Sequence, residues 1–317
     1  MMHDAPMTPD APTTHDDTAP DHKAFLATLT PEARARLTER SDGAGLRHLA
    51  GHLGLILALG ALIAAQVPGW WALMLPQGVA VAFLFTLEHE ATHKTPFASE
   101  RLNEWAGRAA GLLIVQPFEW FRYFHLAHHK HTQDPERDPE LAGLPKPDDW
   151  GSFAWHLASL GYWRAKAALL WRNAFGTIEA PYLPDRIHPR LRREARAMLA
   201  VYAGAALFTL AVSPVLLWAW AVPLILGFPV LRLYLLAEHG RCPMVADMLD
   251  NTRTTTTNAV VRFLAWNMPY HTEHHVLPQV PFHRLPEFHD VLRAHLRHTA
   301  PGYAAFTRDY VAAFERR

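Results

Sequence analysis

The sequence contains very little cysteine and has no excess of charge of either sign. Its single cysteine, Cys242, excludes an intrachain disulfide, a four-cysteine iron–sulfur site and a Cys-x-x-Cys redox motif within these 317 residues. The 30 basic and 30 acidic side chains give a formal net charge of 0, so we expect no nucleic-acid partner. Any redox chemistry must therefore use ligands other than thiolates.

The start of the sequence also lacks the pattern of a secretory signal. Residues 1–23 have no basic segment followed by an apolar core, and they are rich in Asp, Pro, Thr and Ala. This composition is typical of a solvated, disordered tail. We therefore expect residues 24–317 to form the folded domain.

Long apolar runs are present, by contrast, in two separate blocks of the chain. About 20 helical residues, each rising about 1.5 Å, cross a hydrocarbon core of about 30 Å. In the first block, Pro68 and Gly69 followed by Trp70 and Trp71 indicate a turn with interfacial aromatic rings. The sequence therefore predicts an all-α, integral membrane protein with four transmembrane helices in two hairpins. The predicted spans are residues 46–66, 71–88, 197–215 and 218–237.

The basic residues predict the orientation of these spans. Four arginines lie between residues 34 and 47, many basic residues lie between 94 and 196, and the two short turns contain none. The excess of basic residues on cytoplasmic loops then places both termini in the cytoplasm. We expect a multi-pass protein whose active site lies in a cytoplasmic, histidine-rich helical cap formed by residues 89–196 and 238–317.

Three clusters of histidines lie in this predicted cap. They are His89 with His93; His125 with His128 and His129; and His271 with His274 and His275. Residues at i, i+3 and i+4 share one face of a helix, so each cluster can aim its imidazoles at one point. A His-x-x-His-His pattern should arise by chance only about 0.09 times at this histidine content, yet it occurs twice. Eight imidazoles exceed the roughly four ligands of one zinc ion, so two metal ions fit better.

The order and spacing of these clusters resemble the histidine boxes of the membrane fatty acid desaturase family. That family belongs to a superfamily that also holds fatty acid hydroxylases, alkane hydroxylases and carotenoid ketolases. Its pattern is His-x-x-x-His after the second transmembrane helix, His-x-x-His-His some thirty residues later, and a final His-x-x-His-His after the fourth helix. The resemblance covers about residues 46–290. It is specific for the superfamily and much less specific for the substrate.

The resemblance implies a site in which two iron ions activate O₂ and hydrogen is removed from an acyl chain. The expected function is therefore O₂-dependent desaturation of a fatty acyl chain, carried on a lipid, coenzyme A or an acyl carrier. His239 joins the expected ligands because many members have an additional ligand between the last helix and the third box. The nine expected metal ligands are His89, His93, His125, His128, His129, His239, His271, His274 and His275. No catalytic residue is expected beyond these ligands.

The same resemblance defines the expected partners. They are the lipid bilayer, an acyl-lipid or acyl-thioester substrate, and an external electron donor with its reductase. The sequence shows no dinucleotide-binding glycine pattern and no fused haem domain, so the donor should be a separate ferredoxin, rubredoxin or cytochrome. A hydroxylase or ketolase remains the alternative, because the same di-iron oxidant can transfer oxygen to carbon.

A protein of another class could share the first cluster. His89-Glu90-Ala91-Thr92-His93 is a literal His-Glu-x-x-His, the zinc protease motif, in which the glutamate is the general base. An intramembrane protease would leave both His-x-x-His-His clusters unexplained, and in the desaturase interpretation Glu90 is incidental. A membrane protein that only stores or senses metal is a third hypothesis.

Several neighbouring residues have two possible roles. Four carboxylates follow the second cluster; they could accept the second ring N–H of ligand histidines or simply form a loop punctuated by prolines. These residues are Asp134, Glu136, Asp138 and Glu140. We expect His131 to support the site rather than bind metal, and we expect the pair His48 and His52 to be structural.

Overall fold

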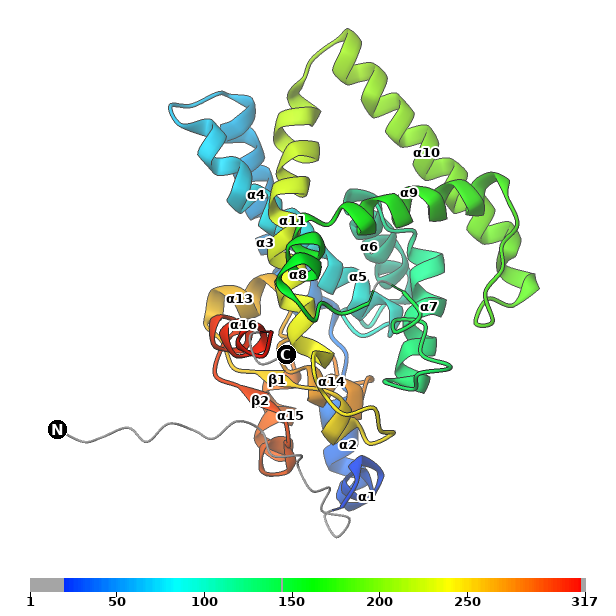
Figure 1. Ribbon diagram of the computed structural model, residues 1–317, viewed down its shortest axis with the longest axis vertical. Helices are drawn as coiled ribbons and strands as arrows, with labels where there is room; N and C mark the ends of the chain where they lie inside the picture. The colour runs from blue at the N-terminus through cyan, green and yellow to red at the C-terminus, as the bar shows by residue number, and fades with distance from the viewer. Residues whose placement is uncertain (1–19, 144, 315–317) are drawn as a thin grey trace, which may run out of the picture.

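The computed structural model describes residues 20–143 and 145–314, which form helices and one short parallel sheet (Figure 1). The elements up to the middle of the chain are α1 (His22–Thr28), α2 (Pro31–Leu37), α3 (Asp42–Ala64), η1 (Trp70–Leu73), α4 (Met74–Ala82), α5 (Leu84–Thr92), α6 (Glu100–Leu113), α7 (Phe118–His131), α8 (Trp150–Ala158) and α9 (Leu160–Phe175). The remaining elements are η2 (Asp185–Ile187), α10 (His188–Ala211), η3 (Leu217–Ala221), α11 (Val222–His239), α12 (Met248–Asn251), β1 (Thr254–Thr255), α13 (Ala259–Leu264), α14 (His271–Val276), α15 (Leu285–Leu292), η4 (Arg293–His295), β2 (Thr299–Ala300) and α16 (Tyr303–Ala312).

The predicted tail, residues 1–23, falls mostly outside the described residues. Its last two residues, His22 and Lys23, already belong to α1. Asp21 caps this helix, because its side chain accepts a hydrogen bond from the amide of Ala24 at 2.7 Å. The helix is also held to the body of the protein, since His22 Nδ1 lies 2.9 Å from an oxygen of Asp247.

Four helical segments are long and apolar enough to cross a membrane, and each overlaps one predicted span. The segments are Pro31–Ala64, Trp70–Thr92, Asp185–Ala211 and Leu217–His239. This confirms a mostly helical protein with four candidate membrane helices. Their pairing in hairpins and the side of the membrane on which the termini lie stay predictions.

The apolar side chains of α3 and α10 point mostly away from the protein. Only 11% of the most apolar window of each segment is buried. Leu57 on α3 is 71% exposed and Leu210 on α10 is 85% exposed. A large apolar surface of this kind is unfavourable in water and is compatible with lipid contact.

The helices α4 and α11 form the closest contact in the membrane-spanning part. Gly78 of α4 lies against the carbonyl of Pro223, and Gly227 of α11 lies against the backbone of Gly78. A Cβ atom on either glycine would overlap the opposing backbone, so only glycine allows this approach. Below the contact, Leu84 and Leu87 of α5 join Phe228 and Leu231 of α11 in the largest buried apolar cluster.

The histidines of α3 make polar contacts with α4 and with the segment that contains α13. His52 Nε2 lies 2.9 Å from the carbonyl of Ala80, and Trp266 Nε1 donates to His52 Nδ1 at 3.2 Å. His48 Nε2 lies 2.8 Å from the carbonyl of Phe263. These contacts agree with the structural role expected for the two histidines.

The second pair of predicted spans is arranged differently. In Figure 1, α10 and α11 are joined at one end and diverge from there. Instead of following α11, α10 packs on α9, where Ala195 and Met198 bury apolar surface against Leu170 and Ala174. The splayed arrangement leaves α9 and the end of α7 beside the site described below.

The C-terminal part of the fold holds the third histidine cluster in place. The strands β1 and β2 pair in parallel, with Thr254 opposite Thr299. Thr254 Oγ1 donates to Glu273 at 2.6 Å, and His289 Nδ1 of α15 lies 2.5 Å from the other oxygen of the same carboxylate. Glu273 is the middle residue of the cluster, so α14 is fixed on the side that faces away from the histidines.

Replacing Gly78 by alanine should destabilise the protein because the new methyl group must push α4 away from α11. Overpacking of this kind lowers the free energy of unfolding by about 1–3 kcal/mol. Thermal unfolding of the detergent-solubilised protein measures the change. Gly54→Ala on α3 is the matched control, since a Cβ there meets no atom within 4 Å. An equal loss in both variants would contradict the proposed close contact.

Candidate metal centre

The nine histidines expected to bind metal are contributed by four helices that meet where two of the candidate membrane segments end. α5 carries His89 and is followed at once by His93; α7 carries His125, His128 and His129; α11 ends on His239; and α14 carries His271, His274 and His275. Seven of the nine are buried, and His93 and His129 are partly buried. Burial of so many polar rings is unfavourable unless they have partners.

The histidines fall into two groups whose ring nitrogens converge. The first histidine group contains His89, His93, His125, His129 and His274, and the second contains His128, His239 and His275. Within each group, one nitrogen of every ring lies within 4.8 Å of the others. His271 adjoins the second group, because its Nε2 atom lies 3.0 Å from Nε2 of His239. The structure thus brings all nine residues to one region.

The ring nitrogens of the second group face one another in an arrangement that favours a cation between them. His239 Nδ1 lies 2.9 Å from the carbonyl of Asn251, so it must donate its proton there. His128 Nδ1 lies 2.9 Å from the Asp138 carboxylate and donates to it. Their Nε2 atoms then carry lone pairs, although they lie only 3.2 Å apart. Two lone pairs at this distance repel each other unless a cation lies between them.

The ring nitrogens of the first group also face one another. Nε2 of His93 lies 2.8 Å from Nε2 of His125, and Nε2 of His274 lies 3.2 Å from Nε2 of His129. Neither ring nitrogen of the buried His89 has a hydrogen-bond partner within the described part of the chain. Unpaired, convergent imidazole nitrogens are what a first-row transition metal ion requires. The residues present therefore fit metal ions, one for each group.

The protonation state of the rings suits metal binding. Burial lowers the pKa of His125, His271 and His274 well below its ordinary value, and the neighbouring histidines lower it further. These rings are therefore neutral at pH 7. Neutral imidazole is the form that binds a metal ion, because its second nitrogen keeps a free lone pair.

A carboxylate supports the second group from outside. Burial alone would raise the pKa of Asp138, but the hydrogen bond and the charge of His128 outweigh it and hold that pKa below its usual value. Burial alone would lower the pKa of His128, but the charge of Glu140 and the hydrogen bond and charge of Asp138 outweigh burial and raise it. A carboxylate in this position fixes the ring and makes its free nitrogen more basic.

Of the four carboxylates that follow the second cluster, two contact the site and two belong to the loop. Asp138 and Glu140 face His128 Nδ1, the latter at 3.3 Å. Asp134 instead binds Arg137 and the amide of Glu136, and Glu136 is exposed. Of the two interpretations left open by the sequence, support of a histidine therefore holds for Asp138 and Glu140, and a role in the loop holds for Asp134 and Glu136. His131, which ends α7, belongs to neither histidine group.

Glu90 has a definite role here, which corrects its interpretation as an incidental residue. It is fully buried, and its Oε2 accepts hydrogen bonds from Thr95 at 2.8 Å and from the amide of Phe282 at 3.1 Å. Its Oε1 faces Nδ1 of His274 at 3.8 Å. Glu90 thus links the first and third clusters. This position argues against the zinc protease hypothesis, because the side chain is engaged on the side away from the converging nitrogens.

Some supporting residues carried no pattern that would have pointed to them. Glu238 faces Nδ1 of His271 at 3.4 Å, Asn251 supplies a carbonyl to His239, and Thr132 lies 3.3 Å from Nδ1 of His275. Glu238 directly precedes His239, and Thr132 lies three residues after His129. Such proximity in sequence is only a weak indication of a supporting role. Asn251 acts through its backbone, so its side-chain type contains no information about this contact.

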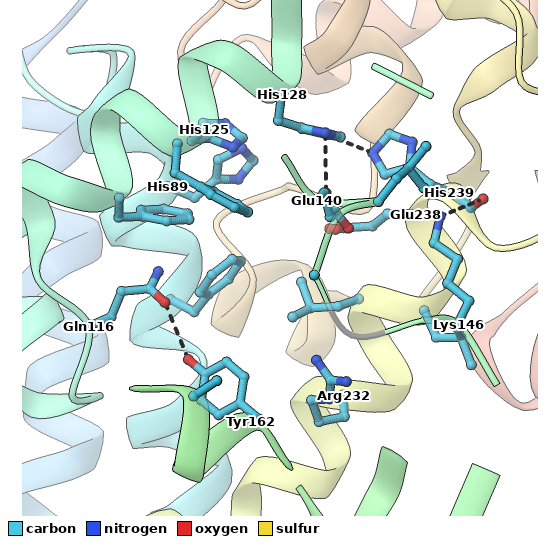
Figure 2. Close-up of a pocket in the computed structure, with 18 of the residues that line it drawn as sticks. His89, Gln116, His125, His128, Glu140, Lys146, Tyr162, Arg232, Glu238 and His239 are labelled. Carbon is cyan, nitrogen blue, oxygen red and sulfur yellow. Dashed lines mark hydrogen bonds and ion pairs between the residues drawn. The ribbon is translucent and has the colours of Figure 1, made fainter. Parts of the chain in front are cut away.

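A cavity of about 270 Å³ opens beside the histidines (Figure 2). Aromatic side chains of α5 and α7, namely Phe85, Trp120, Phe121 and Phe124, form part of its wall. The wall also contains His89, His125, His128, His239 and His271. A molecule bound in this cavity would therefore contact both histidine groups.

The fold and the site together define a mostly helical protein with four candidate membrane helices and two histidine groups that could hold metal ions. The sequence profile of the family described as Fatty acid desaturase matches residues 32–307. The chain belongs to the fatty acid desaturase family, which confirms the resemblance. Membership also supports an oxidoreductase activity.

Two relatives are named as desaturases. The chain is 26% identical over 274 residues to the dihydrorhizobitoxine desaturase of Bradyrhizobium elkanii, which covers 80% of this chain and 75% of the relative. It is 22% identical over 235 residues to the sn-1 oleoyl-lipid 12-desaturase of Arthrospira platensis, which covers 66% of this chain and 64% of that relative.

Asp138→Asn should weaken metal binding about 10- to 100-fold, because the amide can still accept the His128 proton but lacks the charge that makes the ring basic. Competition with a chelator of known affinity measures the change. Glu136→Gln, in the same loop but exposed, should bind metal as the wild type does. Equal affinity of wild type and Asp138→Asn would show that the carboxylate does not support a ligand.

Proposed function

We propose that this protein is an O₂-dependent desaturase that uses two iron ions held by the nine histidines. The observation that carries the proposal is the convergence of ring nitrogens in two separate groups, each within 4.8 Å. One group would hold each ion, with His271 completing the second group. Imidazole-rich sites suit iron, and family membership favours iron over zinc.

The proposed reaction removes two hydrogen atoms from adjacent saturated carbons. O₂ takes up these two hydrogens together with two electrons and two protons and leaves as two molecules of water, while a carbon–carbon double bond forms. The bound iron ions would supply the O₂ activation that this chemistry needs. The two electrons would come from a separate donor of the ferredoxin, rubredoxin or cytochrome type with its reductase.

The protein itself would position the reacting carbons and keep water away. The aromatic wall formed by Phe85, Phe121 and Phe124 excludes water on the side of the cavity next to His89 and His125. An apolar segment held against this wall would present one pair of carbons to the histidine groups. Holding the reacting atoms in one geometry accounts for much of the rate that an enzyme gains.

The family implies a lipid or acyl substrate, and the two relatives are named for different molecules, dihydrorhizobitoxine and an oleoyl lipid. Desaturation of an acyl chain is therefore the function proposed here. Hydroxylation by the same site is the alternative, and the mass of the product distinguishes the two.

We also propose that the histidine site and both termini face the cytoplasm. The turns after α3 and after α10 contain no basic residue, whereas the segment between the second and third spans contains many. The four candidate helices overlap the predicted spans, so the turns would lie on the opposite side of the membrane.

The double variant His274→Ala/His275→Ala should abolish product formation and lower bound iron, because it removes one ligand from each histidine group. The assay is mass spectrometry of extracts from expressing cells, in which the wild type should give a product two mass units lighter than its substrate. His295→Ala, outside both groups, is the control. A product sixteen units heavier would assign the protein to the hydroxylases, and unchanged turnover in the double variant would refute the site.

The orientation can be tested with single cysteines introduced into a Cys242→Ser background. A membrane-impermeant thiol reagent added to intact cells should label Ala65→Cys and Val212→Cys, which lie at the two turns. It should not label Glu136→Cys, although that side chain is exposed. The reverse pattern would place the histidine site outside the cytoplasm.

A further inference from the structure

The cavity beside the histidines has a strongly polar end that the proposed reaction does not use. Figure 2 shows Gln116, Tyr162 and Arg232 on the side of the cavity opposite His125 and His128. Lys166 of α9 also lines this end, and its Nζ atom donates a hydrogen bond to Oε1 of Gln116. An apolar acyl chain has no use for two cations in the wall of its binding site.

Lys166 is a buried cation without a direct carboxylate partner among the described residues. Its side chain is only 9% exposed, and its Nζ lies 4.8 Å from the ring centre of Trp120 and 5.1 Å from that of Tyr162. The nearest acid is reached through an amide, since Gln116 Nε2 donates to Glu88 at 3.2 Å. One hydrogen bond to Gln116 leaves two of the three ammonium protons for a ligand.

Arg232 of α11 is a second cation at the same end of the cavity, and its side chain is half-buried. Its guanidinium lies 5.7 Å from the ring centre of Tyr162, so both cations share one aromatic ring. Arg232 Nη2 donates to His156 Nδ1 at 2.8 Å, but its Nε has no hydrogen-bond partner within the described residues. Burial and the charge of Arg232 lower the pKa of His156 to about 4, so this ring is neutral and does not offset the charge.

Charged residues line both ends of the cavity. At the histidine end, Glu140 faces His128, Glu238 faces His271, and Lys146 donates a hydrogen bond to the carbonyl of His239 at 3.2 Å. Lys166 and Arg232 lie at the other end, where burial lowers the pKa of Lys166 to about 8, Glu88 opposes this and Arg232 adds to it. Two like charges that face one cavity repel each other, and a bound anion would relieve both this repulsion and the loss of hydration of Lys166.

We infer that the substrate carries a free carboxylate, which binds between Lys166 and Arg232 and directs the saturated carbons toward the histidine groups. The inference rests on the proposed desaturase function and extends it to the substrate class, a small carboxylic acid. An arginine fork and a lysine are a common pair for a carboxylate. An ester or thioester of the same acid lacks the charge that these residues recognise.

The size of the cavity agrees with a small acid. A volume of about 270 Å³ lies just below the range of about 300–1,000 Å³ that pockets for drug-sized ligands occupy. A wider groove adjoins it, and both are lined by Trp120 and Lys166. Lys130 and Arg172 line this groove as well, together with the carboxylates of Glu136 and Asp138.

The first test locates the product. Extracts of cells expressing the wild type and the His274→Ala/His275→Ala variant are divided into a water-soluble acid fraction and a lipid fraction and compared by mass spectrometry. A wild-type product two mass units lighter in the acid fraction supports the inference. A product only in the lipid fraction overturns it and leaves the desaturase function intact. The same two fractions are also compared after the extract has been incubated with iron-loaded protein, ferredoxin and its reductase. If neither fraction then contains a lighter product, the desaturase function itself is overturned.

The second test concerns Lys166 directly. Lys166→Met keeps the length of the side chain and removes its charge. KM for the acid should rise roughly 10- to 100-fold, because this is the effect of losing one hydrogen bond to a charged group. The iron content should not change, and Lys166→Arg should restore most of the affinity. Arg164→Met, exposed on the same helix, is the matched control. An equal effect of Lys166→Met on the acid and on its methyl ester would indicate a merely structural role and overturn the inference.

A third measurement needs no turnover. Sodium hexanoate at millimolar concentration should raise the thermal unfolding temperature of the wild type, since a ligand stabilises the state that binds it. The Lys166→Met and Arg232→Met variants should show no such shift, and methyl hexanoate should have no effect on any of the proteins. Equal stabilisation of wild type and both variants by hexanoate would contradict a carboxylate site at these residues.

Discussion

Mutual repulsion among buried imidazoles is the constraint on which the rest of this structure depends. Nine imidazole rings converge with their ring nitrogens facing one another, an arrangement that a bound cation would stabilise. The surrounding protein holds the rings there from outside, through Asp138, Glu90 and Glu238 and through the backbone of Asn251. The proposed metal ions would couple folding to metal binding, because their binding would offset the free energy that the fold loses in bringing these rings together.

The parts of this protein that could be predicted from sequence are those with a local period. Apolar runs of about 20 residues identified four helices that could cross a membrane, and the spacing of histidines at i, i+3 and i+4 identified the ligand-bearing faces of α7 and α14. His239 was different, because only family resemblance singled it out. The structure places it against His128 and His271.

The parts that could not be predicted depend on contacts between distant segments. The role of Glu90 cannot be predicted, because a sequence cannot show that the amide of Phe282, far along the chain, donates a hydrogen bond to that carboxylate. Asp138 and Glu136 lie in one loop and look alike, yet only one of them faces a ligand. Lys166 occurs in an apolar stretch of the sequence, and its burial follows from the packing of its side chain on Trp120 of α7.

The contact between Gly78 and Gly227 has a consequence for the centre below it. α4 is followed by α5, which carries His89 of the first histidine group, and α11 ends on His239 of the second, so the glycine contact fixes the height of one group relative to the other. Sliding α11 by a single turn would move His239 by about 5.4 Å. This displacement exceeds 4.8 Å, the limit within which the ring nitrogens of one group lie from one another. Two residues without side chains, placed on candidate membrane helices, thus set the register of two histidine groups that they never touch.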